Sequence, residues 1–285
     1  MSVAVFGTGL IGSNIARRLL ERGFRVSVWN RSYEKAASLG QFGARVTKSI
    51  REALEGAEIA SINVSDDNAS LYVLENILNN LGNDLVVVNH STVTPLHSRR
   101  AYEMSTRKNC PYIALPIMGG PKEAMSGDLV GIAGGDYDKL VTHKDYIDAL
   151  FRKVHVVGSP EEASAVKLAI NSVYFSAMIG LAEALVLAEG WGVSPEKFFE
   201  IGQDLWIKSI IERYGSRLIA EEYPVSFKLR LAAKDMYYAT VAGSEKGISL
   251  PHISSMAQLL LSASMRKAIS EEDYTRVYKF LKGLV

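Results

Sequence analysis

A lysine and an asparagine stand one helical turn apart within an apolar stretch of this 285-residue chain, as Lys167 and Asn171 of "KLAIN". Residues four apart share a helix face, and Tyr174 and Met178 continue the same stripe. Burial lowers the pKa of a lysine and brings the amine into the range for proton transfer near neutral pH. The residues alone predict either a general acid/base with a hydrogen-bonding partner or a lysine that extends to solvent from an interdomain helix.

Three glycines follow a short apolar run near the N-terminus, in "VAVFGTGLIGSNIARRLL" from Val3 to Leu20. A G-x-G-x-x-G motif that follows a strand and opens a helix is typical of dinucleotide binding. Gly7 permits a tight turn, Gly9 lets a pyrophosphate approach the backbone, and Gly12 lets the helix pack on the strand. The free N–H groups of the helix start favour that anion. The predicted cofactor contacts here are Gly7, Thr8, Gly9, Leu10, Ile11 and Gly12.

The end of the predicted second strand bears on the choice of cofactor. An NAD site usually has Asp or Glu there for the ribose hydroxyls, whereas this chain has Asn30, Arg31 and Ser32. An arginine and a hydroxyl suit a 2′-phosphate, which a carboxylate would repel. These three residues therefore predict NADP rather than NAD. The alternative is that Ser32 only caps the next helix and Arg31 is solvated.

Short apolar runs alternate with helical segments up to about residue 158. The predicted strands are Val3–Phe6, Arg25–Trp29, Ala44–Val46, Glu58–Val64, Asp84–Asn89, Tyr112–Leu115, Leu129–Ala133 and Val154–Val157. A capping box at Ser49 and Glu52, and the pair Thr94–Pro95, predict helix starts. Gly23 and Gly40 predict helix ends. The alternation predicts an α/β fold, with a doubly wound, mostly parallel Rossmann domain over residues 1–160.

The strand signals end after Pro160. Residues 161–189 predict one continuous helix of about 40 Å, which is apolar on most faces and is therefore expected to be buried between layers. Further helices are predicted over residues 194–203, 206–220, 227–247, 251–269 and 271–282. We expect residues 161–285 to form an all-helical substrate and oligomerisation domain that begins with the long interdomain helix.

Composition excludes several classes of function. The chain is 48% hydrophobic and 22% charged, as in a globular protein with a sizeable core, and its net charge of +1 gives no case for nucleic acid or an anionic membrane. The single cysteine, Cys110, excludes an internal disulfide and fits a reducing, cytoplasmic location. The most apolar stretch, residues 163–187, is interrupted by Lys167, Asn171 and Glu183, so no membrane span is expected.

His90 lies beside Ser91 and Thr92 at the carboxyl end of a predicted strand, where ligands bind in open α/β sheets. It is a candidate wall of the nicotinamide site, without a catalytic role. The other four histidines are not spaced as metal ligands, so no metal site is predicted.

Six ordered elements resemble the β-hydroxyacid dehydrogenase family, which includes 3-hydroxyisobutyrate dehydrogenase and the glyoxylate and succinic semialdehyde reductases. They are "FGTGLIGSNIA", "NRS", "HSTVTP", "LPIMGGPKEAMSGDL", "KLAIN" and "FKLRLAAKD", and together they span nearly the whole chain. The resemblance implies an NAD(P)-dependent dehydrogenase or reductase that acts on a small molecule and assembles as a homodimer or homotetramer.

The resemblance also implies roles for single residues in the substrate site. Lys167 matches the family's catalytic lysine, and Asn171 matches the asparagine that helps to hold the substrate. Gly119 and Gly120 match the substrate-binding glycine pair. We expect the backbone N–H groups of this pair to face an anion, because glycine puts no side chain in the way.

Other matches concern the cofactor. Thr92 matches a residue that contacts the cofactor, and Lys234 matches a lysine of the helical domain that closes on cofactor and substrate. Val64 and Ser65, at and just after the end of a predicted strand, complete the predicted cofactor contacts. Asp235, next to Lys234, is interpreted as its ion-pair partner.

One departure from the family pattern bears on the substrate. The family's loop commonly reads Pro-Val-Ser-Gly-Gly, and here Met118 replaces the serine whose hydroxyl helps to bind the acid. The leading prediction is hydride transfer between NADP and a small β-hydroxyacid or its aldehyde or keto counterpart, with Lys167 as general acid/base. The apolar Met118 leaves open a less acidic substrate, such as an imine or a neutral carbonyl, although imine reductases generally lack the lysine. A non-catalytic NADP-binding scaffold is the third hypothesis, but a scaffold needs neither Lys167 nor Asn171.

Overall fold

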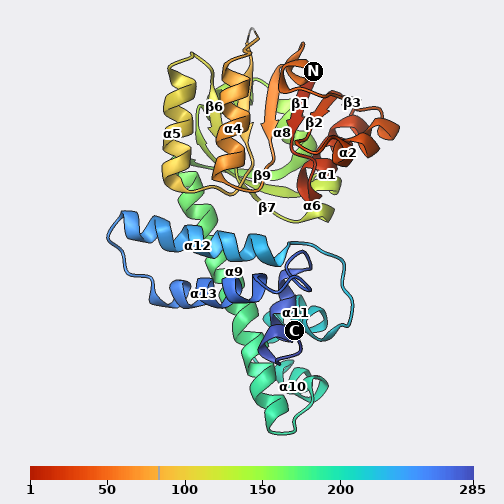
Figure 1. The fold of residues 1–285 in the computed structure, drawn as a ribbon, viewed down its shortest axis with the longest axis vertical. Coiled ribbons are helices and arrows are strands. Elements are labelled where there is room, and N and C mark those ends of the chain that lie inside the picture. The colour runs from red at the N-terminus through yellow and green to blue at the C-terminus, as the bar shows by residue number, and fades with distance from the viewer. Residues whose placement is uncertain (83) are drawn as a thin grey trace. The chain divides into compact units, whose positions relative to one another are not determined.

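The computed structural model describes residues 1–82 and 84–285. The chain divides into two compact units, Met1–Lys167 and Leu168–Val285, each with its own hydrophobic core (Figure 1). The division falls inside the long helix α9 (Pro160–Gly190), later than the predicted boundary after residue 160. The reason is that the first turns of α9 bond to the first unit: Ser164 Oγ lies 2.7 Å from Ser98 Oγ, and Glu161 pairs with Arg99 at 3.1 Å.

The described part of the first unit is built on one nine-stranded sheet. Its strands are β1 (Ser2–Phe6), β2 (Arg25–Trp29), β3 (Arg45–Val46), β4 (Ile59–Ile62), β5 (Val86–Asn89), β6 (Tyr112–Ala114), β7 (Ile117–Met118), β8 (Leu129–Gly135) and β9 (Phe151–Gly158). The spatial order is β3-β2-β1-β4-β5-β6-β8-β7, and β9 pairs with β8. Neighbours from β3 to β6 are parallel, whereas β8 runs antiparallel to β6 and β7. The predicted Rossmann-type fold is confirmed.

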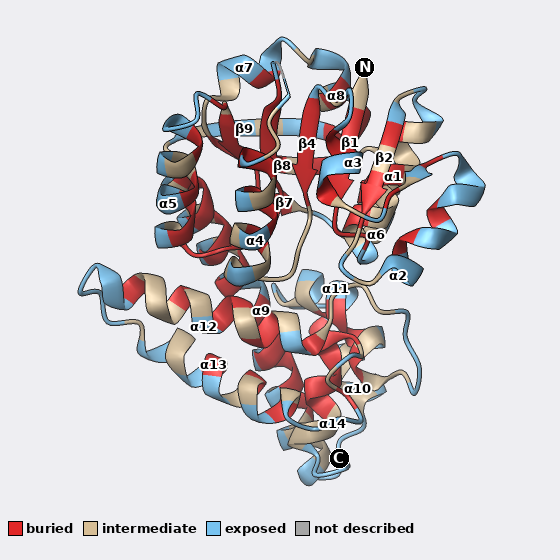
Figure 2. Ribbon diagram, turned by 45° about the horizontal axis from the view of Figure 1, so that its top comes forward, coloured by how far each residue is buried: buried red, intermediate tan, exposed pale blue. Residues whose placement is uncertain are grey.

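Helices cover both faces of this sheet, and strands such as β1 and β4 are buried between them (Figure 2). The helices are α1 (Leu10–Glu21), α2 (Tyr33–Ala37), α3 (Ile50–Leu54), α4 (Asp67–Leu78), α5 (Pro95–Thr106), α6 (Pro121–Ser126), α7 (Tyr137–Val141) and α8 (Lys144–Leu150). Helices α1, α6 and α8 contact one another, and α4 contacts both α3 and α5. These two groups form the layers on either side of the sheet.

Most of the predicted helix signals act as expected. Ser49 accepts a hydrogen bond from the Glu52 N–H at 3.2 Å, and Thr94 caps α5. Gly23, with φ +84°, follows the end of α1. The prediction for Gly40 is wrong, because a short 3-10 helix continues through it to Phe42 and ends at Gly43, which has φ +94°. A positive φ is where glycine is favoured, and Gly43 rather than Gly40 meets that need.

The second unit is helical, as predicted. It comprises the rest of α9, with α10 (Pro195–Gly202), α11 (Lys208–Ile219), α12 (Leu229–Glu245), α13 (Pro251–Ser264), a 3-10 turn (Tyr274–Arg276) and α14 (Val277–Leu281). Among the described residues, α9 is the one helix whose length and composition would allow it to cross a membrane. Core helices pass the same test, and α9 contributes Phe175, Met178 and Leu185 to the core of this unit.

The predicted helix over residues 271–282 begins late, and the preceding helix ends early, at Ser264. The late start follows from Asp273, which is fully buried and forms an extended bridge with Lys228. Its carboxylate accepts hydrogen bonds from the backbone N–H groups of Ser226 and Thr275, at 2.9 and 3.3 Å. These contacts hold residue 273 in an extended conformation, and a helix can form only after it.

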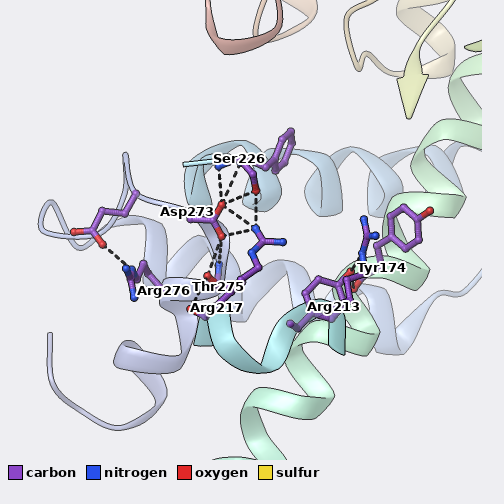
Figure 3. A network of polar contacts seen from close by, with 10 residues as sticks. Tyr174, Arg213, Arg217, Ser226, Asp273, Thr275 and Arg276 are labelled. Atoms are coloured by element: carbon purple, nitrogen blue, oxygen red, sulfur yellow. Dashed lines mark hydrogen bonds and ion pairs between the residues drawn. The ribbon is translucent and has the colours of Figure 1, made fainter. Parts of the chain in front are cut away.

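A buried ion pair completes this cluster in the second unit (Figure 3). Arg217 on α11 donates to Asp273 at 2.8 Å, and its guanidinium also lies 5.2 Å from the ring of Tyr274. Burial alone would raise the pKa of Asp273, but Arg217 and the hydrogen bonds from Ser226 and Thr275 outweigh it and hold the pKa below its usual value. The pair thus joins α11, the start of α12 and the C-terminal segment.

Replacing Asp273 by Asn should destabilise the second unit by about 3–5 kcal/mol, because it leaves the mostly buried Arg217 without a counter-charge. Urea unfolding followed by circular dichroism measures the loss. Glu271→Gln is the matched control. Glu271 lies two residues before Asp273 and also forms ion pairs, with Lys228 and Arg230, but its side chain is 61% exposed. An exposed pair contributes less than about 1 kcal/mol. Equal losses in the two variants would contradict this interpretation of the buried pair.

Candidate functional site

The glycine loop between β1 and α1 leaves room on one side only. Gly7 has φ +92°, and a Cβ added there would lie 2.2 Å from the carbonyl oxygen of Asn63. A Cβ on Gly12 would lie 2.0 Å from the carbonyl oxygen of Gly7. A Cβ on Gly9, in contrast, would meet nothing within 4 Å. Two glycines are therefore required by the packing of the turn, and the third faces open space at the start of α1.

The start of α1 suits an anionic cofactor. Gly9 is the N-cap, and no acidic residue occupies the first turn of this helix. The Thr8 hydroxyl is buried, and it has no hydrogen-bond partner in the part of the chain that the structure describes. A buried hydroxyl without a partner costs free energy unless a ligand satisfies it. With the N–H groups of the helix start, it fits the pyrophosphate of a dinucleotide.

Asn30, at the end of β2, holds the glycine loop rather than pointing away from it. Its Oδ1 accepts from the Thr8 N–H at 3.1 Å, and its Nδ2 donates to the Ser32 carbonyl at 2.9 Å. Ser32 is the N-cap of α2, but its hydroxyl makes no capping hydrogen bond within the described chain. The Arg31 side chain is exposed. The two residues predicted to meet a 2′-phosphate are thus placed beside the glycine loop by Asn30.

The remaining predicted cofactor residues lie at the same edge of the sheet. Val64 follows β4, and its N–H donates to Ser91 Oγ at 3.0 Å, just after β5. Ser65 bonds to the adjacent Asp66, and Thr92 follows Ser91. Because β1, β2, β4 and β5 are parallel, their carboxyl ends meet here with the glycine loop. Ligands bind at this edge in open α/β sheets.

Lys167, the last residue of the first unit, is buried at 8% exposure. Its Nζ donates to the carbonyl of Ile117 at 2.7 Å and lies 3.3 Å from the sulfur of Met118. Both partners belong to β7, a two-residue strand that the sequence pattern did not predict. The amine is therefore held against the predicted substrate loop. It does not extend to solvent, which was one of the two hypotheses for Lys167.

The glycine pair after β7 differs from expectation in one respect. Gly119 has φ +133°, and a Cβ there would lie 2.9 Å from Leu129, so both the backbone and the space require glycine. The Gly120 N–H, however, donates to the Glu123 carboxylate at 2.7 Å. We expected both N–H groups to face a substrate anion. For Gly120 this is not met, because the first turn of α6 places the Glu123 carboxylate on its N–H.

In the second unit, Asp235 on α12 connects two predicted site residues. Its Oδ2 accepts from Asn171 Nδ2 at 2.7 Å, and its Oδ1 pairs with Lys234 Nζ at 2.9 Å. The Lys234 amine also lies 4.7 Å from the ring centre of Tyr238. The predicted ion pair of Lys234 with Asp235 is confirmed. The contact with Asn171 was not predicted, because no local spacing relates α9 to α12.

His90 does not line the predicted nicotinamide site. The residue is 4% exposed, and its two ring nitrogens lie 2.8 Å from the Leu115 carbonyl and 2.8 Å from the Tyr146 hydroxyl. Burial lowers the pKa of His90 to about 4, against the smaller opposing effect of the hydrogen bond to Leu115. The ring is therefore a neutral part of the domain interior. Among the described residues, no three His, Cys, Asp or Glu side chains are grouped as a metal site.

Comparisons with known proteins agree on the family. Residues 2–158 match a family profile described as the NAD binding domain of 6-phosphogluconate dehydrogenase, and residues 162–281 match one described as NAD-binding of NADP-dependent 3-hydroxyisobutyrate dehydrogenase. Glyoxylate/succinic semialdehyde reductase 1 of Arabidopsis thaliana is 27% identical over 99% of each chain. The uncharacterized oxidoreductase YfjR of Bacillus subtilis is 26% identical over 99% of this chain and 100% of that protein.

The same fold occurs in solved structures. A Mycobacterium tuberculosis 3-hydroxyisobutyrate dehydrogenase, solved with L-serine, matches with a TM-score of 0.86 over 99% of both chains, at 20% identity. The structural match independently supports the two-part architecture described above.

The lowered pKa of His90 makes stability depend on pH. Between its folded value of about 4 and the ordinary 6.5, the unfolded chain binds a proton that the folded chain does not. The stability contributed by neutral His90 is therefore fully present above about pH 6.5 and is lost as the pH falls toward 4, by about 3 kcal/mol in all.

His90→Asn should flatten this part of the curve of unfolding free energy against pH, as measured by urea unfolding at a series of pH values. His155→Asn, which changes an exposed histidine of β9, should leave the curve unchanged. A wild-type slope that persists in His90→Asn would show that other groups produce it.

Proposed function

Because this chain belongs to the 3-hydroxyisobutyrate dehydrogenase-like family of β-hydroxyacid dehydrogenases, we propose that it transfers a hydride between NADP and a small β-hydroxyacid or its aldehyde or keto counterpart. The chain is an oxidoreductase with an NAD(P)-binding domain. The observation that carries the proposal is the Lys167 amine, which is buried and held 2.7 Å from the Ile117 carbonyl beside the substrate loop.

Lys167 supplies the proton transfer in this proposal. The bound nicotinamide supplies or accepts the hydride. In reduction the Lys167 ammonium donates a proton to the carbonyl oxygen of the substrate, and in oxidation the amine accepts the hydroxyl proton. The Ile117 carbonyl fixes the direction of the amine. Asn171 orients the substrate without exchanging a proton, and Asp235 fixes the rotation of the Asn171 carboxamide.

Met118 supports a second candidate function. Its thioether lies 3.3 Å from Lys167 Nζ, where the family has a serine hydroxyl. A sulfur is a weak acceptor, so this side of the amine is less suited to a carboxylate and its hydration. A neutral carbonyl or a cyclic imine is therefore the alternative substrate class. A panel of hydroxyacids, semialdehydes and imines, assayed with both cofactors, distinguishes the two classes, and no turnover of any compound would favour an NADP-binding scaffold.

Assembly into a homodimer or homotetramer and a cytoplasmic location stay predictions. The second unit exposes large apolar side chains that a second subunit would cover, among them Val173 and Leu187 on α9 and Trp206. Light scattering at micromolar concentration measures the mass, and a monomer would contradict the prediction.

Arg31→Ala should weaken NADPH binding and leave NADH binding nearly unchanged, because Arg31 and Ser32 would meet the 2′-phosphate. A charge-assisted hydrogen bond contributes about 1.5–3 kcal/mol, so we expect a loss of roughly tenfold or more in NADPH affinity. Fluorescence titration with each cofactor measures it. Arg25→Ala, at the opposite end of β2, is the control and should change neither affinity. Equal losses for both cofactors would contradict the phosphate assignment.

Lys167→Ala should lower kcat by about 10²–10⁴-fold while NADPH binding is retained, because the cofactor contacts lie on other elements. Lys167→Arg should not restore activity, since a guanidinium keeps its proton at neutral pH. Asn171→Ala should raise KM more than it lowers kcat. Steady-state kinetics with the substrate from the panel measures all three, and full turnover by Lys167→Ala would show that the lysine is structural.

A further inference from the structure

A hydrogen-bonded series of four buried or partly buried polar side chains runs through the first unit and includes the contacts of His90 described above. Asn63 Nδ2 lies 2.9 Å from Ser61 Oγ, which lies 3.1 Å from the Tyr146 hydroxyl. The Tyr146 hydroxyl lies 2.8 Å from His90 Nε2, and His90 Nδ1 lies 2.8 Å from the Leu115 carbonyl. Ser61 and Tyr146 are fully buried, so neither hydroxyl can exchange these partners for water.

The Leu115 carbonyl determines which nitrogen of the His90 ring carries the proton. The Leu115 carbonyl can only accept, so Nδ1 of the neutral ring carries the proton and Nε2 accepts from Tyr146. The Tyr146 hydroxyl also lies 3.1 Å from Ser61 Oγ. Ser61 in turn accepts from the Asn63 amide, which can only donate through Nδ2. The ring of His90 is therefore held in one tautomer and one orientation.

One end of the hydrogen-bonded series, Asn63, lies against the glycine loop. The Asn63 N–H donates to the Phe6 carbonyl at 2.7 Å, and the Asn63 carbonyl oxygen leaves no room for a side chain at Gly7. A Cβ on Gly12 would lie 3.0 Å from Asn63 Cβ, in addition to its clash with the Gly7 carbonyl oxygen. The backbone of His90 is fixed as well, because its N–H donates to the Ile62 carbonyl at 2.9 Å. His90 is thus anchored to β4, at the edge where the cofactor residues meet.

The other end of the hydrogen-bonded series is the Leu115 carbonyl. It lies two residues before Ile117, whose carbonyl holds Lys167. Leu115 connects β6 to β7 and is fully buried. Its N–H donates to the Asn89 carbonyl, whereas its own carbonyl receives a side chain, His90, instead of a neighbouring strand. Pro116 follows and has no N–H to add a further bond. The path of the chain into Ile117 is therefore held by His90 at the Leu115 carbonyl and by β8 at the Pro116 carbonyl, which accepts from the Ile132 N–H at 3.0 Å.

We propose that His90 is a positioning residue for the proton-transfer site: by holding the Leu115 carbonyl it fixes the Ile117 carbonyl and, through it, the amine of Lys167. The inference rests on the proposed role of Lys167. His90 touches neither the substrate nor the reacting atoms, and it acts only through the backbone of residues 115–117.

A matched pair of variants separates this role from packing. Leucine and asparagine branch alike and leave the same space where the imidazole was, but only asparagine places an N–H where Nδ1 lies. We expect kcat to fall by about 10²-fold in His90→Leu and to return to within about fivefold of wild type in His90→Asn. NADPH affinity should change in neither variant. Equal kcat values in the two variants would overturn the proposal.

A second measurement does not depend on turnover. Amide hydrogen exchange in a peptide covering residues 113–120, followed by mass spectrometry, should be at least about tenfold faster in His90→Leu than in wild type and close to wild type in His90→Asn. Exchange that is unchanged in His90→Leu overturns the proposal, as does faster exchange without a loss of kcat. If the wild type turns over no compound of the panel, the proposed function fails, and the exchange result still decides whether His90 holds this segment.

Tyr146→Phe tests the same hydrogen-bonded series if His90→Leu does not fold, because it removes only the hydroxyl that fixes Nε2. We expect faster exchange over residues 113–120 and a lower kcat. Tyr112→Phe is the control, since this hydroxyl is equally buried but bonds to Asn89, which also bonds to Ser70. It should leave both values unchanged, and the same behaviour in the two phenylalanine variants would contradict the proposal.

Discussion

The hydrogen bond from the Lys167 amine to the Ile117 carbonyl is the interaction on which the proposed proton-transfer site depends. A buried amine is costly unless polar groups bond to it, and this one donates to a backbone carbonyl at 2.7 Å. The bond requires that Lys167 on α9 and Ile117 on β7 lie side by side. Helix α9 places the first, because its opening turns bond to α5, and β7 places the second, because it pairs with β8.

In each unit a buried polar network holds the segment that leads to predicted site residues. In the first unit the network is a neutral chain that ends on Leu115, just before β7. In the second unit it is an ion pair between Arg217 and Asp273, which holds Ser226 just before α12, the helix of Lys234 and Asp235. Both networks lie where the backbone changes from one element to the next and backbone pairing alone is incomplete.

Local signals in the sequence predicted the alternating strands, the helical second half and the glycine loop, because each depends on residues close together in the chain. The cap at Thr94 and the ion pair of Lys234 with its neighbour Asp235 are of this kind. Strand β7 was missed because two residues show no alternation. The partners of His90 were missed because Leu115 and Tyr146 are 25 and 56 residues away from it in sequence. The late start of the last helix was missed because a long-range contact of Asp273 overrides helix propensity.

The central claim is that the amine of Lys167 carries the proton, and chemical rescue tests it most directly. In Lys167→Ala, turnover of the substrate should rise with the concentration of added methylamine or ethylamine, because a small amine can occupy the space of the missing side chain and lie against the Ile117 carbonyl. The same amines should not accelerate the wild type. A folded Lys167→Ala protein that binds NADPH and stays equally slow at every amine concentration would contradict the account.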